Sequence, residues 1–168
     1  GFAPFIIPPD LPGFHVGKKA DNPGLRASPT VQLNFDNMRV PAENLLGDET
    51  QGFIYAMQSL DNGRLGIAAQ AIGIARAALE HSVAYAGERK QFGKAIKEFE
   101  AIQFKLADMA MRVAGSRALL HAAAAAKDRG QNVRQFSSMA KLMASETALW
   151  VTTQAVQILG RYGYVKSS

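Results

Sequence analysis

The segment ERKQFGK, residues 88–94, holds an arginine, an aromatic residue and a glycine in a short break between two apolar-periodic runs. Arg89 carries a permanent charge on a planar fork of donors, which suits a phosphate group. Phe92 could anchor the loop or stack on a flat ligand, and Gly93 permits a turn. The alternative is a structural corner between two helices, with Phe92 packed into the core. The residue types point either to a flat, phosphorylated ligand or to a plain connection.

A second chemical group lies in SLDNGRLG, residues 59–66, near the start of the first helical pattern. Arg64 occupies the apolar stripe of that pattern, and Asp61 precedes it by one turn on the same side. The two residues could form a self-contained i,i+3 ion pair, worth roughly a few tenths of a kcal/mol. Gly63 between them costs about 1 kcal/mol relative to alanine in a helix. Because a glycine also gives a ligand room to approach the backbone, both interpretations stay open.

A third segment, QILGRYGYV at residues 157–165, ends the last helical pattern. Gly160 is placed as a C-terminal helix stop, and free backbone groups around such a glycine can also contact a ligand.

The sequence gives no support for other classes of site. The histidines His15, His81 and His121 lack metal-ligand spacing, cysteine is absent, and no phosphate-loop, dinucleotide or serine-nucleophile motif occurs.

Three long helical patterns must position these groups. Apolar residues recur at spacings of three and four between residues 50 and 162, a stretch without proline. The predicted buried stripes are Phe53, Met57, Leu60, Ile67, Ala71, Ile74 and Ala78 in the first run; Phe99, Ile102, Leu106, Met109, Val113 and Leu120 in the second; and Phe136, Ala140, Met143, Val151, Gln154 and Ile158 in the third. Arg64 fills the gap in the first stripe, and Asp128-Arg129-Gly130 supplies a stop between the second and third runs. Short connections make the helices antiparallel neighbours, and a fourth helix would close their core.

Residues 1–48 differ in composition from the rest of the chain, since they contain all seven prolines and several short apolar runs. Strands are predicted at residues 4–8, 14–17 and 30–36. In the last of these, apolar and polar residues alternate, which predicts one buried face formed by Val31, Leu33 and Phe35. The predicted fold class is therefore α+β. A partial antiparallel β domain over residues 1–48 precedes three long helices of an incomplete four-helix bundle over residues 49–168.

Composition and charge fit an ordinary globular protein, with 48% hydrophobic and 20% charged residues. No apolar run approaches the ~20 residues that a membrane span needs, and no signal peptide is evident. The net charge is +5, with lysine and arginine scattered along the chain. This pattern favours a solvated basic surface, and a multiply phosphorylated ligand is the functional alternative. Because the chain begins at Gly1 rather than methionine, it is expected to be a fragment.

Five ordered stretches carry a resemblance to a known family. They are GLRASPTVQLNFDNMRVPAENLLG (24–47), LDNGRLGIAAQAIGIA (60–75), ERKQFGKAI (88–96), IQFKLADMAM (102–111) and AVQILGRYGY (155–164). Together they resemble the acyl-CoA dehydrogenase family, and most of all its short-chain, butyryl-CoA type. The resemblance implies the second half of a middle β domain plus three of four C-terminal helices. It also implies a flavoprotein of fatty acid metabolism that assembles as a homotetramer, a dimer of dimers.

The resemblance further implies which residues meet the ligands. The residues expected to reach the FAD of a partner subunit are Arg89, Gln91 and Phe92, and Glu100 is expected at a position that contacts the flavin. The residues expected to line the adenosine end of FAD are Gln157, Ile158, Leu159, Gly160 and Arg161. The residues expected to flank the acyl-CoA thioester and pantetheine are Asp61, Asn62, Gly63 and Arg64.

In that family a glutamate removes the α proton of the acyl thioester while the β hydrogen leaves as hydride to FAD. The flavin then passes electrons to an electron-transferring flavoprotein. The glutamate is expected beyond Ser168, and the position that some relatives use instead is Gly63 here, so the chain alone is expected to lack the base and to be inactive. Two other departures are Glu100 in place of glutamine and Arg161 in place of the second glycine of a pair. These two residues could contact each other.

The preferred interpretation is part of a flavin-dependent short-chain acyl-CoA dehydrogenase. The alternative keeps the fold as a catalytically incompetent, oligomerising helical module without flavin. Nucleic-acid binding is the weakest class, because lysine and arginine are scattered without a run of five or more and aromatic residues do not alternate with them. The sequence decides neither the acyl chain length nor the choice between dehydrogenase and oxidase. The resemblance implies the cytoplasm for a bacterial source and the mitochondrial matrix for a eukaryotic one.

Overall fold

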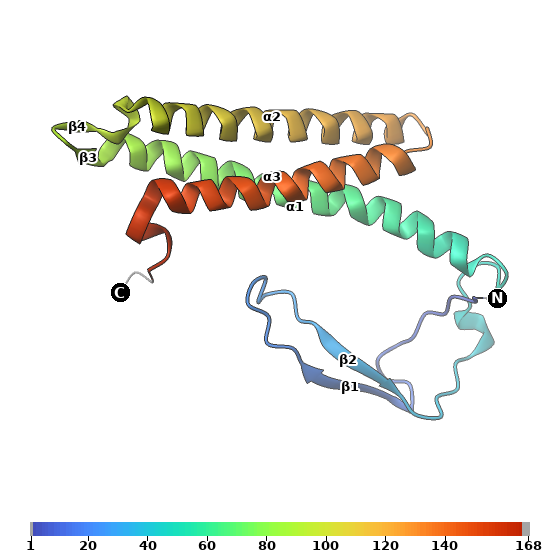
Figure 1. Ribbon diagram of the computed structural model, residues 1–168. Coiled ribbons are helices and arrows are strands. Elements are labelled where there is room, and N and C mark those ends of the chain that lie inside the picture. Colours follow the sequence, from blue (N-terminus) through green and yellow to red (C-terminus); the bar gives the residue numbers. More distant parts are fainter. Residues whose placement is uncertain (1, 166–168) are drawn as a thin grey trace. The chain divides into compact units, whose positions relative to one another are not determined.

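The computed structural model describes residues 2–165 (Figure 1). Its contacts divide the chain into two units, one up to Met57 and one from Gln58. The helix α1 (Gly52–Glu88) begins in the first unit and continues through the second. The domain boundary predicted after residue 48 falls inside the first unit and stays a prediction.

The first unit contains a two-stranded antiparallel sheet, formed by β1 (Phe14–Lys19) and β2 (Val31–Phe35). Phe14 lies opposite Phe35, and the two rings are 5.7 Å apart between centroids. Two of the three predicted strands are thereby confirmed. The predicted buried face of β2 is wrong: Leu33 and Phe35 are 49% and 54% exposed. A sheet of two strands has too little surface to bury a face unless another layer covers it, and none does among the described residues of this unit.

The predicted strand at residues 4–8 is also wrong, because this segment forms one isolated bridge, between Phe5 and Leu45. Its proline-rich composition explains the difference. Pro4 and Pro8 have no N–H group, so the segment cannot continue a ladder of hydrogen bonds on both sides. A short 3-10 helix, η1 (Ala42–Asn44), follows before the start of α1.

The second unit is a three-helix arrangement, which confirms the α+β class and the three predicted helices. α2 (Glu100–Asp128) and α3 (Arg134–Leu159) run antiparallel, and α1 packs along both of them (Figure 1). The hairpin of β3 (Lys90–Gln91) and β4 (Lys94–Ala95) and the 3-10 helix η2 (Ile96–Glu98) connect α1 to α2. The predicted stop is confirmed as well: α2 ends at Asp128, and Gly130 takes a φ of +70°.

The buried face of α1 is a seam of mostly small residues spaced by three and four. Its members are Leu65, Ala68, Ile72, Ala75, Leu79, Ser82 and Ala86, of which Leu65 and Leu79 are half-buried. The predicted stripe lies beside this seam: Ala71 and Ala78 on it are half-buried against the core, which agrees with the prediction, whereas Leu60, Ile67 and Ile74 are about half exposed. Alanine and serine let helix backbones approach closely, so the small residues face α2 and α3 while the larger neighbours lie beside the contact.

The other two stripes agree better with the sequence. On α2, Met109 and Val113 are buried and the other predicted members are half-buried, which confirms the prediction. On α3, Ala140, Val151 and Ile158 are buried and Gln154 is half-buried, but Phe136 and Met143 are exposed. Their places in the seam are taken by the next residues along the helix, Ser137 and Ala144.

Small polar residues enter this seam without leaving unpaired groups. Ser116 on α2 and Thr147 on α3 share a buried hydrogen bond of 2.8 Å. Ser82 donates to the carbonyl oxygen of Ala78 at 2.7 Å, within its own helix. Such bonds satisfy the hydroxyl groups at little cost in space.

Residues 2–165 contain neither a membrane-spanning helix nor a cluster of metal ligands. None of the described helices combines the length and the apolar character required to cross a membrane. Over the same residues, no group of acidic and histidine side chains is arranged to hold a metal ion.

The shift of the α1 seam can be tested with two isoleucines that are two residues apart. Ile72→Ala is expected to lower the free energy of unfolding by about 2–4 kcal/mol, because it opens a cavity in the core. Ile74→Ala, at an exposed position, should cost less than about 1 kcal/mol. Urea unfolding of the 168-residue chain measures both. Equal losses, or a larger loss at Ile74, would contradict the observed seam.

Candidate functional site

A cleft of about 320 Å³ opens where the C-terminal ends of α1 and α3 meet the β3–β4 hairpin. Figure 1 shows these ends together at one end of the second unit. The residues that line the cleft are Tyr85, Arg89, Gln91, Ile96, Ile158, Leu159, Gly160, Arg161 and Tyr162. Two segments that the sequence singled out separately, 89–91 and 158–161, therefore share one cavity.

The cleft is positively charged, since Arg89 and Arg161 both contribute to its wall. Among the described residues neither arginine forms an ion pair, whereas Arg64, Arg76 and Arg134 all pair with carboxylates. Guanidinium groups without a protein partner are free to bind an anionic ligand, and their planar fork matches a phosphate.

Two glycines bring Arg161 to this cleft. Gly160 ends α3 with a φ of +58°, which side chains other than glycine rarely adopt, and its N–H donates to Val156. The chain then turns back through the 3-10 helix η3 (Gly160–Gly163). A Cβ added at Gly163 would lie 2.9 Å from the Cα of Val156, so no larger residue fits there without movement. The predicted helix stop at Gly160 is confirmed.

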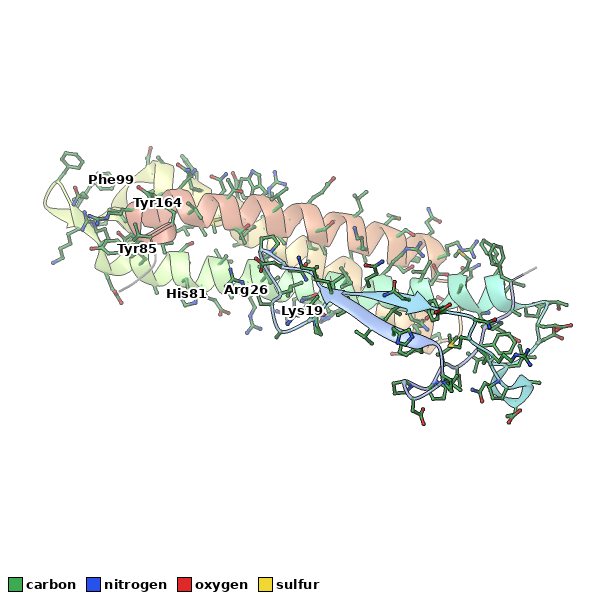
Figure 2. All side chains as sticks on the ribbon, turned by 90° about the horizontal axis from the view of Figure 1, so that it is seen from below. Lys19, Arg26, His81, Tyr85, Phe99 and Tyr164 are labelled. Atoms are coloured by element: carbon green, nitrogen blue, oxygen red, sulfur yellow. The ribbon has the colours of Figure 1, made fainter. Side chains whose placement is uncertain are left out.

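Two tyrosines form an aromatic wall that the sequence analysis missed. Tyr85 and Tyr162 lie with their ring centroids 6.1 Å apart, and the carbonyl oxygen of Tyr85 accepts a hydrogen bond from the N–H of Arg89 at 2.9 Å. In Figure 2, Tyr85, Phe99 and Tyr164 appear at the same end of the helices. The four-residue spacing between Tyr85 and Arg89 places both on one helix face and could have revealed this partner.

The β3–β4 hairpin turns at Phe92 and Gly93, whose φ angles are +50° and +80°. This is the conformation of a tight two-residue hairpin turn, and it costs a bulky residue such as Phe92 about 1–2 kcal/mol. Phe92 is 91% exposed, so the interpretation as a core-packed corner is wrong. The rings of Phe92 and Phe99 pack in a T-shaped arrangement with their centroids 6.3 Å apart. The ammonium group of Lys94 lies over the ring of Phe99. The structure thus presents a strained aromatic residue at a hairpin tip.

Three residues expected to contact FAD lie outside the wall of this cleft, namely Phe92 at the hairpin tip, Glu100 and Gln157. Glu100 is exposed at the first position of α2, where the helix dipole favours a carboxylate. Gln157 is exposed on the last turn of α3. The suggested contact between Glu100 and Arg161 does not form an ion pair within the described part of the chain. The roles of Phe92, Glu100 and Gln157 stay predictions.

The second group surrounds Asp61, whose side chain is 17% exposed. Its Oδ1 accepts a hydrogen bond from Arg64, and its Oδ2 lies 3.7 Å from Nε of Arg134, the first residue of α3. The ion pair that the sequence predicted is present, with a third member from a distant segment. A Cβ placed at Gly63 would meet no atom within 4 Å, so the backbone there is open to approach.

The two groups lie far apart along α1, with Asp61 in its first third and Arg89 just past its last residue. Asp61 and Arg89 are 28 residues apart, which corresponds to about 42 Å along a helix. A ligand of ordinary size cannot contact both groups on one chain. The chain therefore carries two separate candidate sites, one with an arginine pair and aromatic rings and one with an ion-paired carboxylate.

Comparisons with known proteins agree with one another. The family model described as "Acyl-CoA dehydrogenase, C-terminal domain" matches residues 50–168. The chain is 49% identical over 164 residues to the short-chain specific acyl-CoA dehydrogenase of Megasphaera elsdenii, covering 98% of this chain and 43% of that protein. It is 48% identical over 166 residues to the acryloyl-CoA reductase (NADH) of Anaerotignum propionicum, covering 99% of this chain and 42% of that protein.

A solved structure is similar over the same span. The butyryl-CoA dehydrogenase of Megasphaera elsdenii matches with a TM-score of 0.95 and 48% identity, covering 97% of this chain and 43% of that one. The chain thus spans about two fifths of the length of these relatives.

The role of Gly163 in positioning Arg161 can be tested directly. Gly163→Ala is expected to lower the free energy of unfolding by about 1–3 kcal/mol and to displace η3, because the new Cβ meets the backbone of Val156. Gly73→Ala, inside α1 with open space around it, should be neutral or stabilising by up to about 1 kcal/mol. Unfolding curves measure stability, and hydrogen exchange at the Arg161 amide reports the position of η3. Unchanged exchange in Gly163→Ala would contradict this account.

Proposed function

Since the chain belongs to the acyl-CoA dehydrogenase family, we propose that it forms the C-terminal part of a flavin-dependent enzyme that oxidises short-chain acyl-CoA thioesters. The observation that carries the proposal is the cleft in which Arg89 and Gln91 meet the segment 158–161. The similarity to a short-chain specific relative supports the choice of substrate class.

The residues of the cleft fit the nucleotide part of FAD. Arg89 and Arg161 offer guanidinium groups to a diphosphate, and Tyr85 with Tyr162 offers flat apolar surface to a base or ribose. Gly160 leaves its backbone open on the same wall. When bound, FAD supplies the hydride acceptor of the reaction. The part of this chain is to hold the cofactor's phosphates and to keep its adenosine end in place.

The group around Asp61 is the proposed acyl-CoA site. Arg64 can donate hydrogen bonds to the pantetheine part of acyl-CoA. Asn62 and Gly63 are exposed beside it. Gly63 has no side chain to abstract a proton, so we propose that the catalytic base lies beyond Ser168. On this proposal, the chain binds and orients the two reactants, and the proton transfer needs a carboxylate from elsewhere in the polypeptide.

The separation of the two groups supports a shared active site. Because the two groups lie about 42 Å apart along α1, they belong to different catalytic centres if both are used. A two-fold dimer satisfies this condition, since each chain then lends its cleft to the partner's centre. We propose such a dimer, paired again into a tetramer, with an electron-transferring flavoprotein as the redox partner. The location in the cytoplasm or mitochondrial matrix is proposed along with it.

A second candidate is the reverse reaction, the reduction of a short enoyl-CoA. The similarity to an acryloyl-CoA reductase (NADH) at 48% identity favours it, because the same binding groups would hold substrate and product. The two candidates differ in the electron partner and not in the residues described above.

The cofactor and substrate can be tested together. The complete gene product is expected to purify yellow with bound FAD, and butyryl-CoA should bleach the flavin absorbance under anaerobic conditions. Reduction by butyryl-CoA without bleaching by longer acyl-CoA esters would support the short-chain class. A colourless protein that cannot be reconstituted with FAD would overturn the proposal and favour a flavin-free helical module.

The shared site predicts recovery of activity in mixed oligomers. Arg89→Ala and Arg64→Ala should each abolish most activity in the complete gene product, because each damages one component of every centre. Co-expression of the two variants should restore about a quarter of the wild-type activity, since half the dimers are mixed and each has one intact centre. Co-expression of Arg89→Ala with Arg161→Ala, both in the cleft, should restore none and serves as the control. Absence of recovery in the first mixture would contradict a centre shared between two chains.

A further inference from the structure

One carboxylate in the second unit is shared by two arginines from different helices. Asp61 Oδ1 accepts from Nη1 of Arg64 on the same helix, and Asp61 Oδ2 lies 3.7 Å from Nε of Arg134 on α3. Asp61 is the least exposed of the three side chains, while Arg134 is mostly exposed. Each oxygen of the carboxylate therefore faces a different arginine, Oδ1 through a hydrogen bond and Oδ2 through an ion pair that is longer than a hydrogen bond.

The main chain of Arg134 is fixed by its neighbours. Its N–H donates to Oδ1 of Asn132 at 3.1 Å, and its carbonyl oxygen accepts from the hydroxyl groups of Ser137 at 3.1 Å and Ser138 at 2.8 Å. These bonds hold the first turn of α3 and set the point from which the Arg134 side chain extends. The Cα of Arg134, from which the guanidinium side chain extends, is therefore held in a defined position.

An arginine at this position is locally unfavourable. The N-terminus of a helix carries a partial positive charge, which disfavours a cation by roughly 0.3–1 kcal/mol. In the described part of the chain, Asp61 is the carboxylate within 4.0 Å of the Arg134 guanidinium. The ion pair with Asp61 offsets the unfavourable interaction between the arginine and the helix dipole.

We propose that Arg134 is a positioning residue for acyl-CoA binding, an inference that rests on the proposed role of Asp61–Arg64 as the substrate site. A carboxylate left alone with one arginine tends to pair with it through both oxygens. By holding Oδ2, Arg134 limits Asp61 to a single contact with Arg64. The remaining donors of the Arg64 fork then stay available for a polar group of the ligand. Arg134 itself does not touch the substrate.

The test uses the complete gene product loaded with FAD and the variant Arg134→Gln. The KM for butyryl-CoA and the Kd for its product crotonyl-CoA, measured by calorimetry, are expected to rise about three- to fivefold, the range of a partly exposed charge pair. The kcat should stay within about twofold, because the reacting atoms are untouched. FAD content and melting temperature should not change. Arg129→Gln, an exposed arginine five residues earlier, is the matched control and should leave all values unchanged.

Two further variants separate positioning from a general structural effect. Arg134→Lys keeps the charge and should restore at least half of the lost affinity. In an Asp61→Asn background, Arg134→Gln should have no additional effect, because the shared carboxylate is gone. Unchanged affinity in Arg134→Gln, or an effect that persists in the Asp61→Asn background, would overturn the inference while leaving the proposed function intact. A wild-type protein that binds FAD but not crotonyl-CoA would instead overturn the substrate site, and the inference with it.

Discussion

Close packing of α1 against α2 and α3 along a seam of small residues is the interaction on which the second unit depends. Ala68, Ala75 and Ala86 on α1 are fully buried, as are Ala140 and Ala144 on α3. A methyl group contributes little apolar area by itself, but it lets the backbones approach and multiplies the van der Waals contacts along the length of the helices. The larger side chains Met109 and Val151 then fill the space between them.

This packing decides where the helices end relative to one another, and the candidate sites lie at those ends. At one end, α3 stops at Gly160 and the chain folds back, which places Arg161 and Tyr162 beside Arg89 and Tyr85. At the other end, the first residue of α3 reaches the Asp61 carboxylate of α1. Neither group would form if the helices slid by one turn, since each combines residues from two elements.

The length of α1 has a functional consequence of its own. A rigid helix holds its two ends at a fixed distance, so the two groups cannot approach each other within one chain. On the proposed function, a second copy would bring its cleft to the ion-paired carboxylate of the first. The aromatic ring of Phe92 is exposed at a strained hairpin tip.

Local sequence features were sufficient to predict several parts of the structure. The absence of proline and the regular apolar spacing predicted three helices, and Gly130 and Gly160 marked where two of them end, because glycine alone readily adopts those φ angles. The charged and aromatic residues of ERKQFGK and QILGRYGYV were recognised by type. The proline-rich start could equally be recognised as irregular, although the strand predicted at residues 4–8 ignored the missing N–H groups.

The tertiary structure alone decided which face of α1 is buried and which residues meet. Two neighbouring stripes on α1 share the same spacing of three and four, so periodicity cannot choose between them. Large side chains such as Ile67 and Ile74 drew the prediction to one stripe, while close helix approach selected the alanine and serine stripe beside it. The same holds for Arg134 and Tyr162, whose partners are far away in the chain. The set of elements and the residue types able to bind ligands follow from local sequence. The partners of those residues depend on helix packing, which distant residues control together.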